Sequence, residues 1–293
     1  MALQIPLRNN RTLETDTVPL VMGILNITPD SFYAGSRLGT VSAAVDAALE
    51  MERTGAAILD IGGESTRPGA EAVSPQEEAD RVIPVITAIR ERSDIALSVD
   101  TRNAIVAREA LNQGADIVND VSALRHDPAM LPLVAEYDVP VVIMHMRGTP
   151  ETMQNNPVYD DVVGEIFTWL KDRAHALVTA GVQPSKIIVD PGIGFGKTLE
   201  HNLRILRELP TFCTLGYPVL LGASRKRFIG RVLETRNPDG SQVPPERRGA
   251  GSLAIHCHAA QAGASILRVH DVAETVDAMR ILNALWDREY THA

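Results

Sequence analysis

Polar and charged side chains lie at, or just after, the C-terminal ends of the short apolar runs of this chain, and they are of types that bind small molecules. These residues are Asn26, Asp60, Asp100, Asn119, His145, Asp190, Ser224, Arg225, Lys226, Arg268 and His270. Carboxylate, amide and guanidinium groups bind the polar edges of ligands, whereas an unpaired charge buried in a core is costly. The pattern predicts one ligand site built from the ends of several strands.

Asp190 and Asn119 are suited to the edge of a nitrogen heterocycle. A carboxylate can accept two parallel N–H donors, such as an amino group beside a ring N–H, and an amide beside it both donates and accepts. Cations are also present in a chain of net charge −9, namely Arg67, Arg225, Lys226 and Arg268. Together these groups indicate a small phosphorylated or electron-rich heterocyclic substrate.

The glycine-rich segment 190–197, DPGIGFGK, superficially suggests a phosphate loop but lacks the required spacing. A Walker motif needs glycine six positions before its lysine, where this chain has Pro191, and the GxGxxG pattern also fails. The glycines instead predict a backbone that passes close to a flat ligand beside Asp190. Lys197 is interpreted as a solvated cation.

The elements that position these residues are eight β-branched apolar runs alternating with amphipathic helical stretches. The predicted strands are residues 20–27, 57–61, 95–99, 117–121, 140–146, 187–189, 218–221 and 264–269. The predicted helices include residues 41–54, 75–92, 103–113, 159–180, 247–262 and 273–286. A doubly wound open sheet also alternates strand and helix, but eight units ending in a helix favour a closed (β/α)8 TIM barrel. We expect a single domain over residues 1–293, with a surface loop at 234–245.

Composition narrows the class of protein further. The 45% hydrophobic and 22% charged residues are typical of a globular chain, and the net charge of −9 argues against a nucleic-acid surface. The N-terminal residues lack the apolar run of a signal peptide, and no stretch of about 18 apolar residues suggests a membrane span. We therefore expect a cytoplasmic enzyme with small-molecule substrates.

Cysteine and histidine spacing does not favour a metal site. Cys213 and Cys257 have no CxxC partner and are interpreted as packing residues. His256 and His258, two apart on a predicted helix, should point to different faces and are poor joint metal ligands.

Three strand-end residues also have a purely structural interpretation. Asp60 is as consistent with a buried pair as with a function, because a buried carboxylate is normally paired. Arg268 could be the internal counter-ion of Asp190, with or without a functional role. His145 fits a hydrogen-bonded core histidine somewhat better than a catalytic base.

The sequence resembles the dihydropteroate synthases, pterin-binding enzymes of folate biosynthesis, over nearly its whole length. The resemblance is carried by residues 22–32, 60–69, 98–101, 119–120, 144–146, 190–197, 224–226 and 268–270. The family continues its first motif as DSFSDGG, whereas this chain has Ala34 in place of the loop acid. That departure puts in doubt a role for that loop carboxylate, but not the pocket in the barrel.

The resemblance implies two substrate sites and a metal. The pterin ring of 6-hydroxymethyl-7,8-dihydropterin pyrophosphate is expected against Asp100, Asn119, Asp190 and Lys226, with Arg268 flanking it. Asn26, Arg268 and His270 are expected to bind the pyrophosphate, with Asn26 also a ligand of Mg2+. The p-aminobenzoate site is expected to comprise Thr66, Arg67, Pro68, Phe195 and Ser224.

The implied chemistry is an SN1-like displacement of pyrophosphate by the aryl amine. Asp100, Lys226, Arg268 and His270 are the expected catalytic residues, and the family implies a homodimer. Two alternatives stay open at this point. A pterin-binding methyltransferase shares the barrel, although Ser224, Arg225 and Lys226 suit it less well, and a paralogue that binds pterin without turnover is supported only by Ala34.

Overall fold

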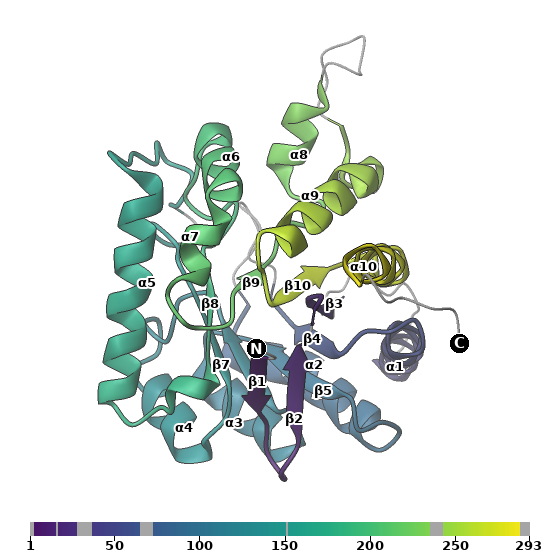
Figure 1. Ribbon diagram of the computed structural model, residues 1–293. Helices are drawn as coiled ribbons and strands as arrows, with labels where there is room; N and C mark the ends of the chain where they lie inside the picture. The colour runs from purple at the N-terminus through teal and green to yellow at the C-terminus, as the bar shows by residue number, and fades with distance from the viewer. Residues whose placement is uncertain are drawn as a thin grey trace.

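Eight parallel strands form a closed barrel in the computed structural model, which describes residues 3–15, 17–27, 37–64, 73–150, 152–234 and 243–287 (Figure 1). Neighbouring strands follow the order β8-β7-β6-β5-β4-β3-β10-β9. A parallel bridge between Val189 and Val219 closes the ring, with the Val189 amide donating to the Pro218 carbonyl at 2.9 Å. Closure confirms the predicted TIM barrel and excludes the open sheet.

The barrel strands lie where the apolar runs predict them. They are β3 (Leu20–Asn26), β4 (Ile58–Gly62), β5 (Ala96–Asp100), β6 (Ile117–Asp120), β7 (Val141–Met144), β8 (Ile187–Asp190), β9 (Leu220–Leu221) and β10 (Ile266–Val269). Their interiors are almost entirely buried, as expected of parallel strands covered on both faces. The strand ends therefore converge on one mouth, as the sequence pattern requires.

Helices surround the strands on the outside (Figure 1). They are α1 (Arg37–Arg53), α2 (Pro75–Arg90), α3 (Ala104–Asn112), α4 (Met130–Tyr137), α5 (Val162–Thr179), α6 (Leu199–Arg207), α7 (Leu209–Cys213), α8 (Arg227–Val232), α9 (Gly249–Gln261) and α10 (Val272–Trp286). Local sequence explains where α2 starts: Ser74 caps it by accepting from the Glu77 amide at 3.2 Å, and Pro75 occupies the first turn.

Side chains inside the barrel change from apolar to polar along five of the eight strands. The apolar layer contains Met22, Ile58, Ala96, Ile117, Val142, Ile188, Leu220 and Ile266. Because inward-facing residues recur every second position, the next inward residues towards the mouth lie two positions further along. Five of them are Asp60, Ser98, Asn119, Asp190 and Arg268. The apolar layer thus forms a floor beneath a polar layer.

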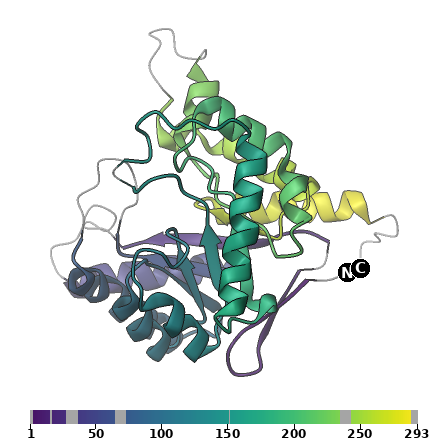
Figure 2. The same cartoon turned by 90° about the vertical axis from the view of Figure 1, so that its left-hand side faces the viewer.

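A hairpin that the sequence analysis did not predict packs against this floor. It consists of β1 (Leu3–Pro6) and β2 (Thr12–Thr15), paired antiparallel, and it lies at the lower right of Figure 2. Ile5 is fully buried in the same cluster as the floor residues. Asn9 and Asn10 have φ values of 56° and 58°, and two such residues between short apolar segments are a hairpin signal. The hairpin covers the end of the barrel opposite the mouth.

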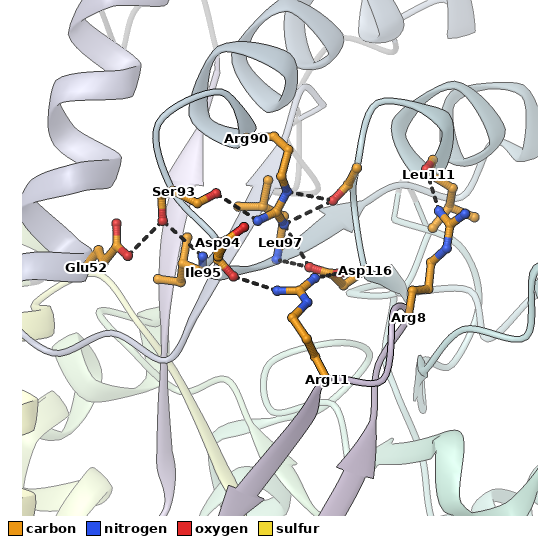
Figure 3. Close-up of polar contacts among 11 residues, drawn as sticks. Arg8, Arg11, Glu52, Arg90, Ser93, Asp94, Ile95, Leu97, Leu111 and Asp116 are labelled. Carbon is orange, nitrogen blue, oxygen red and sulfur yellow. Dashed lines mark hydrogen bonds and ion pairs between the residues drawn. The ribbon is translucent and has the colours of Figure 1, made fainter.

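Two arginines of the hairpin fix it to the barrel: Arg8 donates to the Leu111 carbonyl at 2.6 Å, and Arg11 binds Asp116 (Figure 3). Arg11 pairs with Asp116 and also donates to the Asp94 carbonyl at 2.5 Å. Asp116 Oδ2 accepts from Arg90 at 2.9 Å and from the Leu97 amide at 3.0 Å. This buried carboxylate therefore links the hairpin, helix α2 and strand β5.

Two other expectations concern segments outside the barrel strands. Most of the predicted surface loop at 234–245 lies outside the described residues, and Pro245 begins a short 3₁₀ turn, Pro245–Arg247. Among the helices that the structure describes, none is both long enough and apolar enough to cross a membrane.

Candidate functional site

Arg268 of β10 connects two carboxylates in the polar layer. Its Nε donates to Asp60 Oδ2 at 2.5 Å, and its Nη2 donates to Asp100 Oδ2 at 2.7 Å. Asn119 Nδ2 donates to the same Asp60 oxygen at 3.0 Å. Asp60 is therefore paired, as its structural interpretation predicted, and it orients both Arg268 and the Asn119 amide. Arg268 forms its ion pairs with Asp60 and Asp100 rather than with Asp190, and the Asp190 charge contributes less than either of them to raising the pKa of Arg268.

The polar layer has more acceptors than donors. Asp60 Oδ1 is a buried acceptor without a hydrogen-bond partner within the described part of the chain, and the buried Ser98 hydroxyl, which can donate or accept, has none either. Burial raises the pKa of Asp100 to about 7, although Arg268 opposes that rise, and the nearby Asp60 charge adds to it. A carboxylate in these surroundings gains from any ligand that brings positive charge or N–H donors.

Asp190, at the end of β8, lies on the other side of the mouth. Its Oδ1 accepts from the Gly192 amide at 2.7 Å. Burial raises its pKa, and the Lys226 charge lowers it. A Cβ placed on Gly222 would lie 3.9 Å from both Asp190 Oδ2 and Arg268 Cδ, so Gly222 leaves space between the two side chains. Asp190 and Arg268 therefore line the same part of the mouth.

Lys226 precedes α8 and joins Asp190 to Phe195. Its Nζ donates to the Ile193 carbonyl and lies 4.3 Å from the centroid of the Phe195 ring. Burial lowers the pKa of Lys226 to about 8, and the Asp190 carboxylate opposes that shift. The structure thus brings together three predicted site residues, namely Asp190, Phe195 and Lys226.

Two of the three glycines of the segment 190–197 serve a different purpose from the predicted one. Gly192 and Gly196 have φ values of 71° and 65°. A Cβ on Gly192 would lie 1.9 Å from the His145 carbonyl oxygen, and one on Gly196 would lie 2.8 Å from that of Arg147. The expectation that these two glycines give clearance for a flat ligand is wrong. They let the loop after β8 contact the loop after β7.

Lys197 and His145 meet between these two loops. Lys197 is only 3% exposed, so its interpretation as a solvated cation is wrong. Its Nζ lies 3.1 Å from His145 Nδ1, and the imidazole makes an edge contact with Trp169. Burial lowers the pKa of His145 to about 2, with a further contribution from Lys197. His145 is therefore a neutral core histidine, which confirms the favoured interpretation. No sequence spacing signalled the burial of Lys197.

Ser224 and His270 lie side by side on the mouth. Ser224 Oγ accepts from the His270 amide at 3.2 Å and lies 3.0 Å from His270 Nδ1. Arg225, which was predicted among the substrate-facing cations, instead pairs with Asp271, its Nε donating to Oδ2 at 3.1 Å. The backbone of Arg225 has a φ of 55°, in the left-handed region, unlike that of Ser224 and Lys226 on either side of it. Arg225 is therefore best understood as a structural residue.

Asn26 ends β3 at the same rim. In the strand register Asn26 aligns with Gly62, and Gly62 aligns with Asp100. The predicted residues Thr66, Arg67 and Pro68, and the substituted position Ala34, lie outside the described residues. At the base of that loop Glu64 accepts from Arg102 at 3.1 and 3.2 Å, an ion pair that the sequence analysis missed.

The two helical histidines make separate hydrogen-bond contacts. His256 Nδ1 is 3.2 Å from the Thr275 hydroxyl, whereas His258 Nε2 is 2.7 Å from the Leu206 carbonyl. The two rings thus face different neighbours, as predicted. Cys213 and Cys257 are free thiols.

Comparison with known proteins gives concordant matches. The sequence model of the family described as pterin binding enzyme matches residues 22–270. A dihydropteroate synthase of Synechocystis is 47% identical over 266 residues, which cover 91% of this chain and 90% of that protein. A structure of Xanthomonas albilineans dihydropteroate synthase with 4-aminobenzoic acid has a TM-score of 0.88 and 47% identity, covering 98% of this chain and 99% of the other. Another, of the Xanthomonas albilineans enzyme in complex with 7,8-dihydropteroate, has a TM-score of 0.85 and 45% identity, covering 97% and 99%.

Proposed function

The chain belongs to the dihydropteroate synthase family, a family of transferases of folate biosynthesis, and from that premise we propose how its barrel mouth performs the reaction. The reaction condenses 6-hydroxymethyl-7,8-dihydropterin pyrophosphate with p-aminobenzoate to give 7,8-dihydropteroate and pyrophosphate. The observation that carries the assignment of residues is the acceptor-rich layer of Asp60, Asp100, Asn119 and Asp190 around Arg268.

The pterin binds in this layer. Asp190 accepts hydrogen bonds from the pterin amino group and the adjacent ring N–H. Because Asn119 Nδ2 donates to Asp60, the Asn119 amide is oriented to bind the neighbouring edge of the ring. Lys226 stays close enough to Asp190 to offset its charge. Asp100 and Arg268 flank the ring, where the carboxylate faces the carbon that becomes electron-poor.

The p-aminobenzoate binds beside Phe195, whose ring is held against Lys226. Ser224 supplies a hydroxyl at the edge of this site, and its contact with His270 places it next to the pyrophosphate. Roles for Thr66, Arg67 and Pro68 in covering the aryl amine follow from the family resemblance.

The pyrophosphate binds at the rim through Asn26, Arg268 and His270. Asn26 offers an amide oxygen, and Mg2+ commonly takes few protein oxygens together with substrate phosphates and water. Asp60 and Asp100 are already paired with Arg268, so Asn26 fits such a metal as one protein ligand. Bound there, Mg2+ would neutralise charge that grows on the leaving pyrophosphate.

The chemistry is dissociative. The bond between the pterin methylene carbon and the pyrophosphate oxygen breaks first, and its electron pair leaves with the pyrophosphate. Arg268 and His270 stabilise that negative charge, while the Asp100 carboxylate stabilises the cationic pterin. The neutral amine nitrogen then attacks the methylene carbon and releases a proton, so no strong base is required.

The test is direct synthesis by the purified protein. With the pterin pyrophosphate, Mg2+ and p-aminobenzoate we expect dihydropteroate, detected by chromatography, and loss of the product when Mg2+ is chelated. Asp190→Asn should abolish pterin binding, measured by calorimetry, without altering the circular dichroism spectrum. Failure of the wild-type protein to form dihydropteroate would contradict the assignment.

The order of bond breaking has its own test. Pyrophosphate should be released slowly from the pterin substrate when p-aminobenzoate is omitted, because the C–O bond breaks before the amine attacks. A strict requirement for p-aminobenzoate before any pyrophosphate appears would instead favour concerted displacement.

Oligomeric state and location rest on the family alone. We propose a homodimer acting in the cytoplasm on small-molecule substrates, with neither nucleic acid nor membrane as partner. Sedimentation equilibrium checks the dimer, and a single species at the monomer mass would contradict it.

A further inference from the structure

Lys197 is a buried cation for which the proposed reaction has no direct use. Its Nζ donates to the Phe195 carbonyl at 2.9 Å and to the His145 carbonyl at 3.2 Å, and lies 3.1 Å from His145 Nδ1. An ammonium group has three donors, and these three acceptors match that number. The match requires His145 to carry its proton on Nε2, consistent with a neutral imidazole.

Burying a charge is costly, so a lysine whose hydrogen bonds all go to uncharged acceptors is an unusual choice at such a position. Lys197 joins two loops that both reach the mouth, the one after β7 and the one after β8. Burial lowers the pKa of Lys197 well below its ordinary range, and the Asp190 carboxylate opposes that shift. The arrangement is a cross-link between two loops.

Side chains from other elements hold the rest of the β8 loop in the same manner. The Ile193 carbonyl accepts from Lys226. The Gly194 carbonyl accepts from Gln154 at 2.7 Å, and the Gly196 carbonyl accepts from Tyr159 at 2.9 Å. Phe195 lies between Gly194 and Gly196, and its carbonyl accepts from Lys197. Its ring faces the other lysine, Lys226.

We propose that Lys197 is a positioning residue for the aryl amine: by holding the Phe195 carbonyl and the His145 backbone together, it fixes the ring that forms the p-aminobenzoate wall. This inference rests on the proposed function of the mouth. Lys197 itself does not touch either substrate. It acts through Phe195, so its loss should affect one substrate and spare the other.

A double-mutant cycle tests this coupling. Lys197→Met keeps the length of the side chain and removes its donors. We expect it to raise the KM for p-aminobenzoate about tenfold, the factor that corresponds to losing one hydrogen bond from a charged group. The KM for the pterin pyrophosphate should stay within about twofold, since Asp190 and Asn119 keep their own contacts. Lys171→Met, at an exposed lysine of α5, is the matched control and should change neither constant.

The second arm of the cycle uses Phe195→Ala. If Lys197 acts through the ring, adding Lys197→Met to Phe195→Ala should raise the KM for p-aminobenzoate no further. Effects that multiply in the double variant, or a KM that rises equally for both substrates, would overturn the proposal.

Folding and function are separated by two further measurements. Lys197→Gln retains a donor for the Phe195 carbonyl and should recover part of the KM effect. If both Lys197 variants fail to fold while Lys171→Met folds, Lys197 is a general determinant of the fold and the proposal is overturned. Failure of the wild-type protein to synthesise dihydropteroate would contradict the proposed function instead, before any variant is compared.

Discussion

Arginine–carboxylate clusters occur at both ends of the barrel, and they contain these groups in opposite proportions. At the hairpin end one carboxylate, Asp116, is shared by two arginines, Arg11 and Arg90, and also accepts from a backbone amide (Figure 3). At the mouth two carboxylates, Asp60 and Asp100, share one arginine, Arg268, and Asp60 Oδ1 is left without a partner among the described residues.

The difference separates a structural cluster from a binding one. A buried carboxylate whose hydrogen bonds are all made within the protein has nothing to offer a ligand, but it connects the elements that contact it. A cluster with surplus acceptors is costly in the free protein and gains when a ligand supplies the missing donors. In TIM barrels generally, the two ends divide stability and chemistry in this way.

The largest expected effect comes from removing one arginine from each cluster. Arg268→Met should lower kcat about 10³-fold, because it removes a preorganised donor from the site where charge develops. Arg90→Met makes the same chemical change at the other end and should leave kcat within about twofold. Steady-state assays of both variants check the comparison. Similar losses of kcat in the two would show that the ends are not functionally distinct.

Changing one carboxylate at each end should lower stability mainly at the hairpin end and activity mainly at the mouth. Asp116→Asn should lower the free energy of unfolding by about 2 kcal/mol, because it weakens hydrogen bonds to charged partners. Asp100→Asn should leave that free energy unchanged or raise it, since burial already disfavours the ionised carboxylate, but it should lower kcat about 100-fold. Urea unfolding and steady-state kinetics measure the two quantities. A stability loss in Asp100→Asn that matches that in Asp116→Asn would contradict the distinction.

The mouth, unlike the hairpin end, should impose a pH dependence on the reaction. Burial raises the pKa of Asp100 to about 7, so below that pH the carboxylate gains a proton and no longer stabilises the pterin cation. Burial lowers the pKa of Lys226 to about 8, so above that pH the lysine loses the charge that offsets Asp190. We expect a bell-shaped profile of kcat/KM with limbs near these values. Arg90→Met should keep both limbs, and a flat profile below pH 7 would exclude the role of Asp100.

The smallest expected effect concerns two serines. Ser93 Oγ donates to Glu52 at 2.7 Å and accepts from the Ile95 amide at 3.0 Å in the network at the hairpin end. Ser93→Ala should therefore cost about 1 kcal/mol of unfolding free energy. Ser98→Ala, in the polar layer, removes a hydroxyl without a partner among the described residues and should cost less than about 0.5 kcal/mol. Thermal unfolding in calorimetry compares the two. An equal cost would mean that the Ser98 hydroxyl is satisfied in the free protein.

Much of the mouth could be predicted from the sequence, because strand-end positions are a local property. Asp100, Asn119, Asp190 and Arg268 each directly end or follow an apolar run, and closure of the barrel brings them together. The hairpin could have been found as well. Its Asn9 and Asn10 turn is a local signal, but the flanking segments are short and lack a strong apolar alternation.

Lys197 shows what sequence reasoning could not reach. Its neighbours in sequence are glycines and a phenylalanine, which give no sign that its ammonium is enclosed. The enclosure depends on His145, 52 positions earlier, and on two glycines that let the loops approach each other. Burial of a polar residue in a loop is decided by contacts between loops, which no local pattern records.

The sequence by itself determined the order of the barrel strands, many of the helices around them and most of the polar residues at the mouth, because residue periodicity and chain order are local. The tertiary structure decided which charges pair. Arg268 meets Asp60 and Asp100 across 208 and 168 positions, rather than Asp190, because the register of the closed barrel places those two carboxylates within reach of its guanidinium. It also decided that Asp116 is saturated while Asp60 is not, and that difference separates the structural end of the barrel from the binding end.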